Sequence, residues 1–231
     1  PGPGTEFYSL REYVPGDPFK NINWKAFART GDLMINEKCR DAVTDLYIIL
    51  DSRDIARIGT VLKNPLEMGT VAAASLASFF IQRRDSVSLT IYDEKLSFLP
   101  PDTGDKQYFK ILSSLAGVAP RGTMPLQAVT NSLAARFSRG SPVFIISSCE
   151  GDGTVPSAVR DLVGRGHEVT VLSPSSVDFE RLVCRIPRMS YEVLKLERQN
   201  RLTSLAGFGS QVIDWMPDMD LSQALLQVRG Y

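Results

Sequence analysis

Most of this chain is predicted to form an α/β fold, with a doubly wound, mostly parallel sheet and helices on both faces. Two apolar runs, TDLYIIL before Asp51 and PVFIISS at residues 142–148, are typical of strands buried on both sides. Segments with helical spacing separate the predicted strands. Crossovers of that length join parallel strands and are right-handed, so together the two patterns predict a parallel sheet.

The elements follow one another from residue 44 to the end of the chain. The predicted strands are 44–50, 86–92, 95–101, 142–148, 167–173 and 211–215, and the predicted helices are 66–84, 106–116, 125–137, 155–164, 191–206 and 221–228. Asp93 and Glu94 separate two adjacent strands, which indicates a hairpin at a sheet edge. In the first helix, four alanines permit close packing on the sheet.

Composition limits the classes of function. The 231 residues include 26 Lys and Arg against 26 Asp and Glu, so no overall field favours nucleic acid or an acidic membrane. We expect this chain to bind neither. Cys39, Cys149 and Cys184 form no C-x-x-C pair, which fits a reducing compartment. The longest apolar run, residues 71–81, falls short of the roughly 20 residues that span a bilayer.

Residues 1–43 differ from the rest and are expected to be an extended segment that precedes the α/β domain of residues 44–231. The chain begins with PGPG and lacks an initial Met, so we expect it to be a piece of a longer protein. Two interpretations of this polar, aromatic segment compete, a recognition surface and a structural clasp on the α/β body. We favour the clasp, which would bury Tyr13 and Trp24 and pair charges such as Arg11 internally.

Polar side chains cluster where predicted strands end. Asp51 ends the first strand, Asp54 follows in the next loop, and Thr123 precedes the helix at 125–137. Ligands of doubly wound sheets bind at such strand ends, and Mg²⁺ prefers oxygen ligands from carboxylates and hydroxyls. The alternative for Thr123 is a helix N-cap, which its residue type favours.

The N-terminal pattern R-E-Y-x-P-G-D-x-x-x-x-I-x-W-K-A-x-A-R-T-G-x-L resembles the signature of the domain-of-unknown-function 58 family. Its marked residues are Arg11, Tyr13, Gly16, Asp17, Trp24 and Arg29. The order of elements from residue 44 is similar to the von Willebrand factor A fold. The resemblance implies a membrane-tethered protein on the cytoplasmic face, anchored through a region that precedes this chain. It also implies a protein partner, a MoxR-type AAA+ ATPase, in assembly or chaperone-like work.

The von Willebrand factor A fold carries a metal-ion-dependent adhesion site, and the resemblance implies a degenerate version here. Asp51 and Thr123 match ligand positions, but the two serine positions of D-x-S-x-S hold Arg53 and Ile55. The late aspartate position holds Ser148. Glu150 and Asp152 lie nearby and are possible replacement ligands if Arg53 faces solvent. We therefore expect no cofactor and disfavour Mg²⁺ or Mn²⁺, with Arg53 beside Asp51 supplying the positive charge.

Catalysis finds little support in the sequence. His167 is the only histidine and begins a predicted strand, where a surface or capping role is expected, and Cys149 therefore lacks a histidine partner. We predict a non-enzymatic protein-interaction domain. The alternative is a metal-assisted hydrolase or phosphate-handling enzyme that uses strand-end carboxylates such as Asp51 and Asp54.

Overall fold

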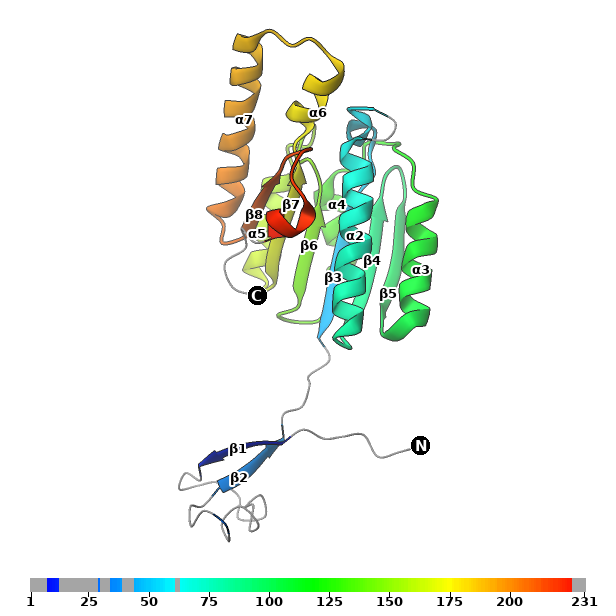
Figure 1. Cartoon of the computed structure of the whole chain (residues 1–231), viewed down its shortest axis with the longest axis vertical. Helices are drawn as coiled ribbons and strands as arrows, with labels where there is room; N and C mark the ends of the chain where they lie inside the picture. Colours follow the sequence, from blue (N-terminus) through cyan, green and yellow to red (C-terminus); the bar gives the residue numbers. More distant parts are fainter. Residues whose placement is uncertain (1–7, 13–28, 30–33, 39–43, 61–62, 226–231) are drawn as a thin grey trace. The chain divides into compact units, whose positions relative to one another are not determined.

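A computed structural model describes residues 8–12, 29, 34–38, 44–60 and 63–225 of this protein (Figure 1). The chain divides into two compact units, residues 1–43 and residues 44–231. Among the described residues, no helix combines the length and apolar character needed to cross a bilayer.

The described part of the first unit is a two-stranded antiparallel ribbon, which the sequence analysis did not predict. Its strands are β1 (Tyr8–Glu12) and β2 (Met34–Lys38). Arg11 lies within β1, and Arg29 is exposed. The other signature residues lie outside the described residues; they are Tyr13, Gly16, Asp17 and Trp24. The clasp therefore stays a prediction.

The second unit is built on a six-stranded sheet in the order β5-β4-β3-β6-β7-β8. Its strands are β3 (Asp45–Asp51), β4 (Ser86–Tyr92), β5 (Leu96–Asp102), β6 (Pro142–Ile146), β7 (Glu168–Pro174) and β8 (Gln211–Trp215). All neighbours pair in parallel except β4 and β5. The predicted parallel sheet with a hairpin at one edge is confirmed.

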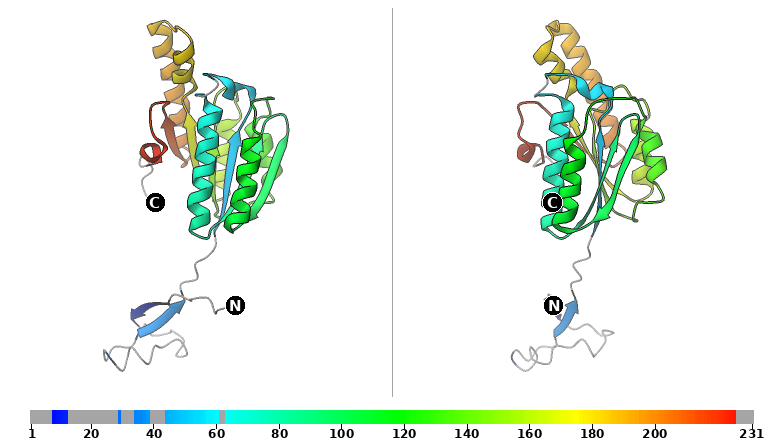
Figure 2. Two further views of the ribbon diagram at one scale, coloured as in Figure 1. Left: turned by 45° about the vertical axis from the view of Figure 1, so that its right-hand side comes forward. Right: turned by 90° about the vertical axis from the view of Figure 1, so that its right-hand side faces the viewer.

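Helices cover both faces of this sheet (Figure 2). The helices of this unit are η2 (Asp54–Arg57, a 3₁₀ helix), α2 (Pro65–Gln82), α3 (Gly104–Ala116), α4 (Leu126–Leu133), α5 (Val155–Gly164), α6 (Ser176–Val183), α7 (Arg188–Ala206) and α8 (Leu221–Leu225). Helices α2, α3 and α8 pack into one core, and α4, α5 and α7 pack into the other. The doubly wound α/β fold is therefore confirmed.

Apolar and polar residues do not alternate in strand β3 because both of its faces are buried. Leu46, Ile48 and Leu50 enter the core under α2, whereas Tyr47 and Ile49 enter the core under α4 and α5. Successive side chains of a strand point to opposite faces, so a strand covered on both sides needs apolar residues at every position.

Several observed elements differ from the predicted ones. Helix α4 ends at Leu133, four residues earlier than predicted, and α6 was not predicted at all. The start of α6 did carry a signal. The Ser175 hydroxyl accepts a hydrogen bond from the Asp178 backbone N–H, which is the usual contact of a serine N-cap.

His167 is buried, so the expected surface or capping role is wrong. Its ring packs edge-on against Phe137 at 5.5 Å between centroids, and Nδ1 lies 3.2 Å from the Ser141 hydroxyl. Burial, the largest effect, lowers the pKa of His167 from its ordinary value. The histidine is therefore a neutral member of the packed interior, away from the strand ends at which catalysis was considered.

The strand order reverses between β3 and β6. From β3 the chain goes first to β4 on one side and later returns to β6 on the other. Loops that leave neighbouring strands at such a switch point diverge and leave room for a site. The residues that follow β3 and β6 therefore meet at the carboxyl edge of the sheet, where Asp51 and Ser147 lie.

Gly122 fixes the loop before α4 to the turn between β4 and β5. Its φ is +73°, and a Cβ at this position would lie 2.3 Å from the Glu94 nitrogen. The carbonyl of Gly122 accepts a hydrogen bond from the Asp54 N–H, and the Met124 N–H donates to the Asp93 carbonyl. The close approach therefore sets the distance between the loops after β3, β4 and α3.

We expect Gly122→Ala to lower the free energy of unfolding by about 3 kcal/mol or more, because left-handed backbone strain and a backbone clash add up. Gly140→Ala is the matched control. Gly140 has a φ of +70°, but a Cβ added there would meet no atom of a non-adjacent residue within 4 Å, so only about 1 to 2 kcal/mol of strain applies. Urea denaturation of both variants measures the difference, and equal losses would contradict the role given to the close approach.

Candidate functional site

The centre of the candidate site is a buried ion pair between Asp51 and Arg53. Arg53 Nε donates to Asp51 Oδ1 at 2.9 Å, and Nη2 donates to Oδ2 at 2.6 Å. The Arg53 backbone N–H also donates to Oδ1, at 3.1 Å. The Arg53 and Asp51 side chains are only 4% and 2% exposed. Such a two-pronged pair fixes the guanidinium in the plane of the carboxylate.

A second carboxylate completes the surroundings of the guanidinium. Arg53 Nη1 lies 3.2 Å from Asp152 Oδ2, and the Arg53 Cζ lies 5.4 Å from the centre of the Tyr92 ring. Burial alone would lower the pKa of Arg53, but the hydrogen bond and charge of Asp51, together with Tyr92 and Asp152, raise it above its ordinary value. Arg53 is therefore a permanent cation held between two carboxylates.

The Asp51 carboxylate has no free hydrogen-bonding position. Besides the three bonds from Arg53, Oδ2 accepts a hydrogen bond from the Ser147 hydroxyl at 2.6 Å. Ser147 Oγ in turn accepts one from the Cys149 N–H. A carboxylate offers about four acceptor positions, and all four are used here.

Asp152 also caps α4 from a different loop. Its Oδ2 accepts a hydrogen bond from the Leu126 N–H at 2.8 Å, and its Oδ1 accepts two from Thr154. Burial would raise the pKa of Asp152, but the bonds from Thr154 and Leu126 and the charge of Arg53 lower it. The negative Asp152 thus stabilises both Arg53 and the positive end of the α4 dipole.

Thr123 does not join this cluster. It is exposed, and its hydroxyl makes no hydrogen bond to another residue that the structure describes. The N-cap of α4 is Pro125, so the expectation that Thr123 caps the helix is wrong. Because Asp152 satisfies the first free amide of α4, the helix needs no local hydroxyl.

Ser148 and Glu150 belong to a neighbouring cluster around Arg198, which the sequence analysis missed. Arg198 of α7 is 2% exposed. Its guanidinium donates to the Ser148 carbonyl at 3.1 Å and to Asp214 at 2.8 Å, and it lies 3.5 Å from Glu150. Bonds to Ser173 link the same side chain to β7.

The sequence held little that could have identified Arg198. The helix containing it carries five other charged residues, and nothing in the spacing marks the one that is buried. Arg198 nevertheless connects the carboxyl ends of β6, β7 and β8. Buried charges require partners, and the partners come from three separate segments that only the fold brings together.

The donor set does not fit a divalent cation. Asp51 has all of its acceptor positions engaged, Thr123 faces solvent, and Arg53 places a positive charge between the two carboxylates. Glu150 pairs with Arg198 and Arg201. Across the described residues, no three His, Cys, Asp or Glu side chains are close enough to share a metal ion.

The side chains considered for catalysis are likewise engaged or isolated. Burial raises the pKa of Cys149 to about 11, so its thiol is protonated at neutral pH. The Asp54 side chain is 56% exposed and forms an ion pair with Arg57. The Ser147 hydroxyl does meet a carboxylate, but it is buried, and that carboxylate, Asp51, is already paired with Arg53, which makes it a poor base.

The sheet order, the helices on both faces and the polar residues at the switch point define a von Willebrand factor A-type α/β domain. Residues 9–176, more than half of the chain, match the family model described as "Protein of unknown function DUF58". The chain belongs to this family.

Two solved structures share the fold. One is an aerotolerance-related membrane protein from Bacteroides fragilis, with 20% identity, a TM-score of 0.55, and coverage of 80% of this chain and 95% of that one. The other is the VWA domain of SpRpn10, with 11% identity, a TM-score of 0.53, and coverage of 81% and 96%. At these identities the likeness shows the fold alone.

The curated relatives are themselves uncharacterised. Mb1516 of Mycobacterium bovis and Rv1480 of Mycobacterium tuberculosis are each 25% identical to this chain over 185 residues, which cover 77% of the chain. The chain spans 58% of the length of these relatives.

Removal of the buried Arg53 guanidinium should destabilise the domain. We expect Arg53→Met to lower the free energy of unfolding by about 3–5 kcal/mol, because Asp51 and Asp152 are left buried without their partner. Arg53→Lys should recover only part of the loss, since a lysine cannot form the two-pronged pair. Urea denaturation at neutral pH provides the measurement.

Arg57→Met is the control for this experiment. Arg57 pairs with Asp54 at the surface, where the two side chains are 70% and 56% exposed. Its loss should cost less than about 1 kcal/mol. A comparable effect for Arg53 and Arg57 would show that the buried pair does not hold the strand ends together.

Proposed function

We propose that this chain is a non-enzymatic protein-interaction domain whose strand-end site is held by Arg53 where related folds hold a metal ion. The observation that carries this proposal is the placement of the guanidinium between Asp51 and Asp152, with both carboxylates engaged. A fixed cation keeps the loops in one arrangement without ion binding. The adhesion site is therefore degenerate, and docking does not use metal coordination.

We further propose that the partner is a MoxR-type AAA+ ATPase, in assembly or chaperone-like work. The support is the resemblance of the N-terminal signature, together with a site in which Asp51 is fully hydrogen-bonded, Asp54 pairs with Arg57 and the Cys149 thiol is protonated. A partner would supply the chemical activity, and this domain would supply the contact surface.

Membrane tethering of the parent protein, with this domain on the cytoplasmic face, is part of the same proposal. Its support is the resemblance and the description of the Bacteroides fragilis protein as a membrane protein. The chain spans little more than half of its curated relatives, which leaves room in such proteins for further segments.

Binding and turnover assays test the proposed function together. The 231-residue chain is immobilised on a sensor. It should bind more of a MoxR-type ATPase from the same genome than an albumin-coated reference surface binds. The free chain should hydrolyse no member of a phosphoester panel in Mg²⁺ or Mn²⁺, because Asp51 has no free oxygen.

Two results would contradict the proposal. One is the failure of the folded chain to retain the ATPase under any nucleotide condition. The other is phosphoester turnover that disappears in Asp51→Asn while the variant remains folded by circular dichroism.

A further inference from the structure

The α6–α7 hairpin carries most of the large apolar side chains that the described residues expose. Eight such side chains are exposed, and five of them lie on these two helices. The five are Leu182, Val183, Met189, Val193 and Leu196, which are 57%, 47%, 79%, 53% and 58% exposed. Single exposed apolar residues are normal on a protein surface, but a group on one protrusion indicates an interaction site.

Helix α7 is apolar on two opposite sides. Its buried side is formed by Tyr191, Leu202 and Leu205, with Arg198 among them. Met189 and Val193 are each two residues from Tyr191, and Leu196 is two residues from Arg198. Two residues correspond to a rotation of about 200° around a helix, so all three point away from the buried side. The fold uses only one of the two apolar sides.

The hairpin extends beyond the sheet. Arg198 bonds to the strand ends of β7 and β8, and the part of α7 that carries Met189, Val193 and Leu196 precedes it. Figure 1 and Figure 2 show α6 and this half of α7 standing past the ends of the strands. The apolar side chains therefore have no sheet to cover them.

Polar contacts give the hairpin a fixed shape. The Tyr191 hydroxyl donates to Asp178 Oδ1 at 2.7 Å, and the Arg181 guanidinium lies 4.5 Å from the centre of the Tyr191 ring. These contacts join α6 to α7. A surface that is ordered before binding loses little conformational entropy when a partner docks.

The tip of the hairpin is basic. Arg181, Arg185 and Arg188 lie between residues 181 and 191, a stretch without Asp or Glu. All three are exposed, and within the described residues none forms an ion pair with a carboxylate. Arg181 stacks on Tyr191, whereas Arg185 and Arg188 have no carboxylate partner among the described residues and lie beside apolar side chains, so they attract a partner that offers carboxylates and an apolar face.

We propose that this hairpin surface binds an acidic amphipathic helix of a partner protein. The hairpin surface is defined as Leu182, Val183, Met189, Val193 and Leu196 together with Arg185 and Arg188. The partner helix lays its apolar side along α7 and places its carboxylates at the basic tip. This inference rests on the proposed function as an interaction domain and names the surface and the chemistry of its partner.

Two other occupants fit the surface less well. A second copy would bring two basic tips together, and like charges repel. An anionic membrane would attract the tip but repel Glu192 and Glu197, which are exposed and flank the apolar side of α7. A helix that is acidic at one end only avoids both conflicts.

The test uses synthetic helical peptides as probes. The acidic probe has leucines on one side, glutamates at one end and neutral glutamines at its other positions, and the basic probe replaces each glutamate by lysine. Fluorescence anisotropy with the full 231-residue chain should show saturable binding of the acidic probe, weakened by added salt, and no binding of the basic probe. Vesicles of phosphatidylglycerol and phosphatidylcholine, and sedimentation of the chain alone, test the other two occupants.

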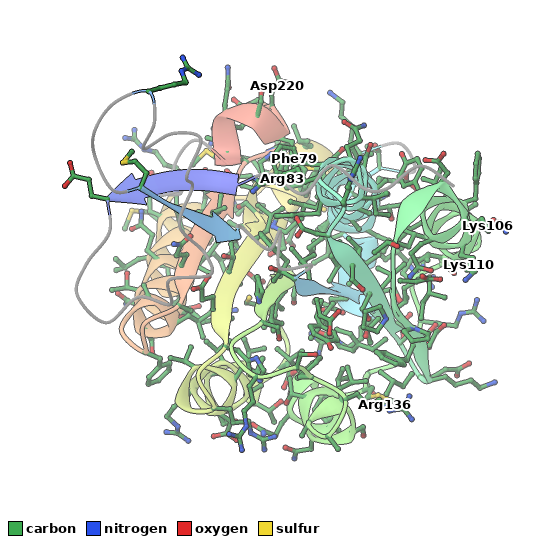
Figure 3. The ribbon with its side chains drawn as sticks, turned by 90° about the horizontal axis from the view of Figure 1, so that it is seen from below. Phe79, Arg83, Lys106, Lys110, Arg136 and Asp220 are labelled. Carbon is green, nitrogen blue, oxygen red and sulfur yellow. The ribbon has the colours of Figure 1, made fainter. Side chains whose placement is uncertain are left out.

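Surface variants locate the binding. Two double variants are made, Arg185→Glu with Arg188→Glu and Met189→Ser with Val193→Ser. Each should lower the affinity of the chain for the acidic probe by about tenfold or more. All four residues are exposed, so the variants should keep the stability of the parent. The matched controls Lys106→Glu and Phe109→Ser change exposed residues of α3 and should leave binding unchanged; Figure 3 labels Lys106 in the view from below.

The proposal is overturned if the acidic probe does not bind, if the hairpin variants bind it as well as the parent does, or if the chain prefers vesicles or dimerises through this surface. Failure of the proposed function is separate. If the ATPase binds the hairpin variants normally, this inference is wrong and the proposed function stands. If the ATPase does not bind the parent chain, the proposed function fails, and the peptide assay alone decides the chemistry of the surface.

Discussion

A guanidinium buried between two carboxylates is the interaction on which the strand-end region depends. Arg53 joins Asp51, at the end of β3, to Asp152 in the loop after β6, and Asp152 in turn caps α4. Taking three charges out of water is unfavourable, and only their mutual pairing and the further bonds from Ser147 and Thr154 offset it. The positions of the loops after β3 and β6 therefore depend on each other through Arg53.

Arg198 is a second buried arginine that joins strand ends, farther along the same edge of the sheet. It connects the ends of β6, β7 and β8, as Arg53 connects β3 to the β6 loop. Together the two arginines close the carboxyl edge with cations that belong to the chain itself. The edge that binds ligands in many doubly wound sheets is thus occupied by internal contacts, and most of the large apolar side chains that the described residues expose lie instead on the α6–α7 hairpin.

The sequence was sufficient for the sheet and insufficient for most of the site. Strands such as β3 and β6 are continuous apolar runs, and that pattern has few other solutions in a chain with intervening helices. The proximity of Arg53 to Asp51 follows from a spacing of two residues in one loop. The contacts of Asp152 with Leu126 and of Arg198 with Asp214 join residues 26 and 16 positions apart, and no local pattern encodes them. The predicted capping role of Thr123 was wrong for the same reason. Asp152, from another loop, accepts the hydrogen bond of the Leu126 N–H at the start of α4.

The strand-end site depends most on Arg53, which occupies the place of a cation. Crystals of the chain grown in millimolar MnCl₂, with data collected at the manganese absorption edge, test this placement directly. We predict a guanidinium between Asp51 and Asp152 and no anomalous peak within coordination distance of either carboxylate. A manganese peak bound to Asp51, with Arg53 displaced toward solvent, would contradict the account.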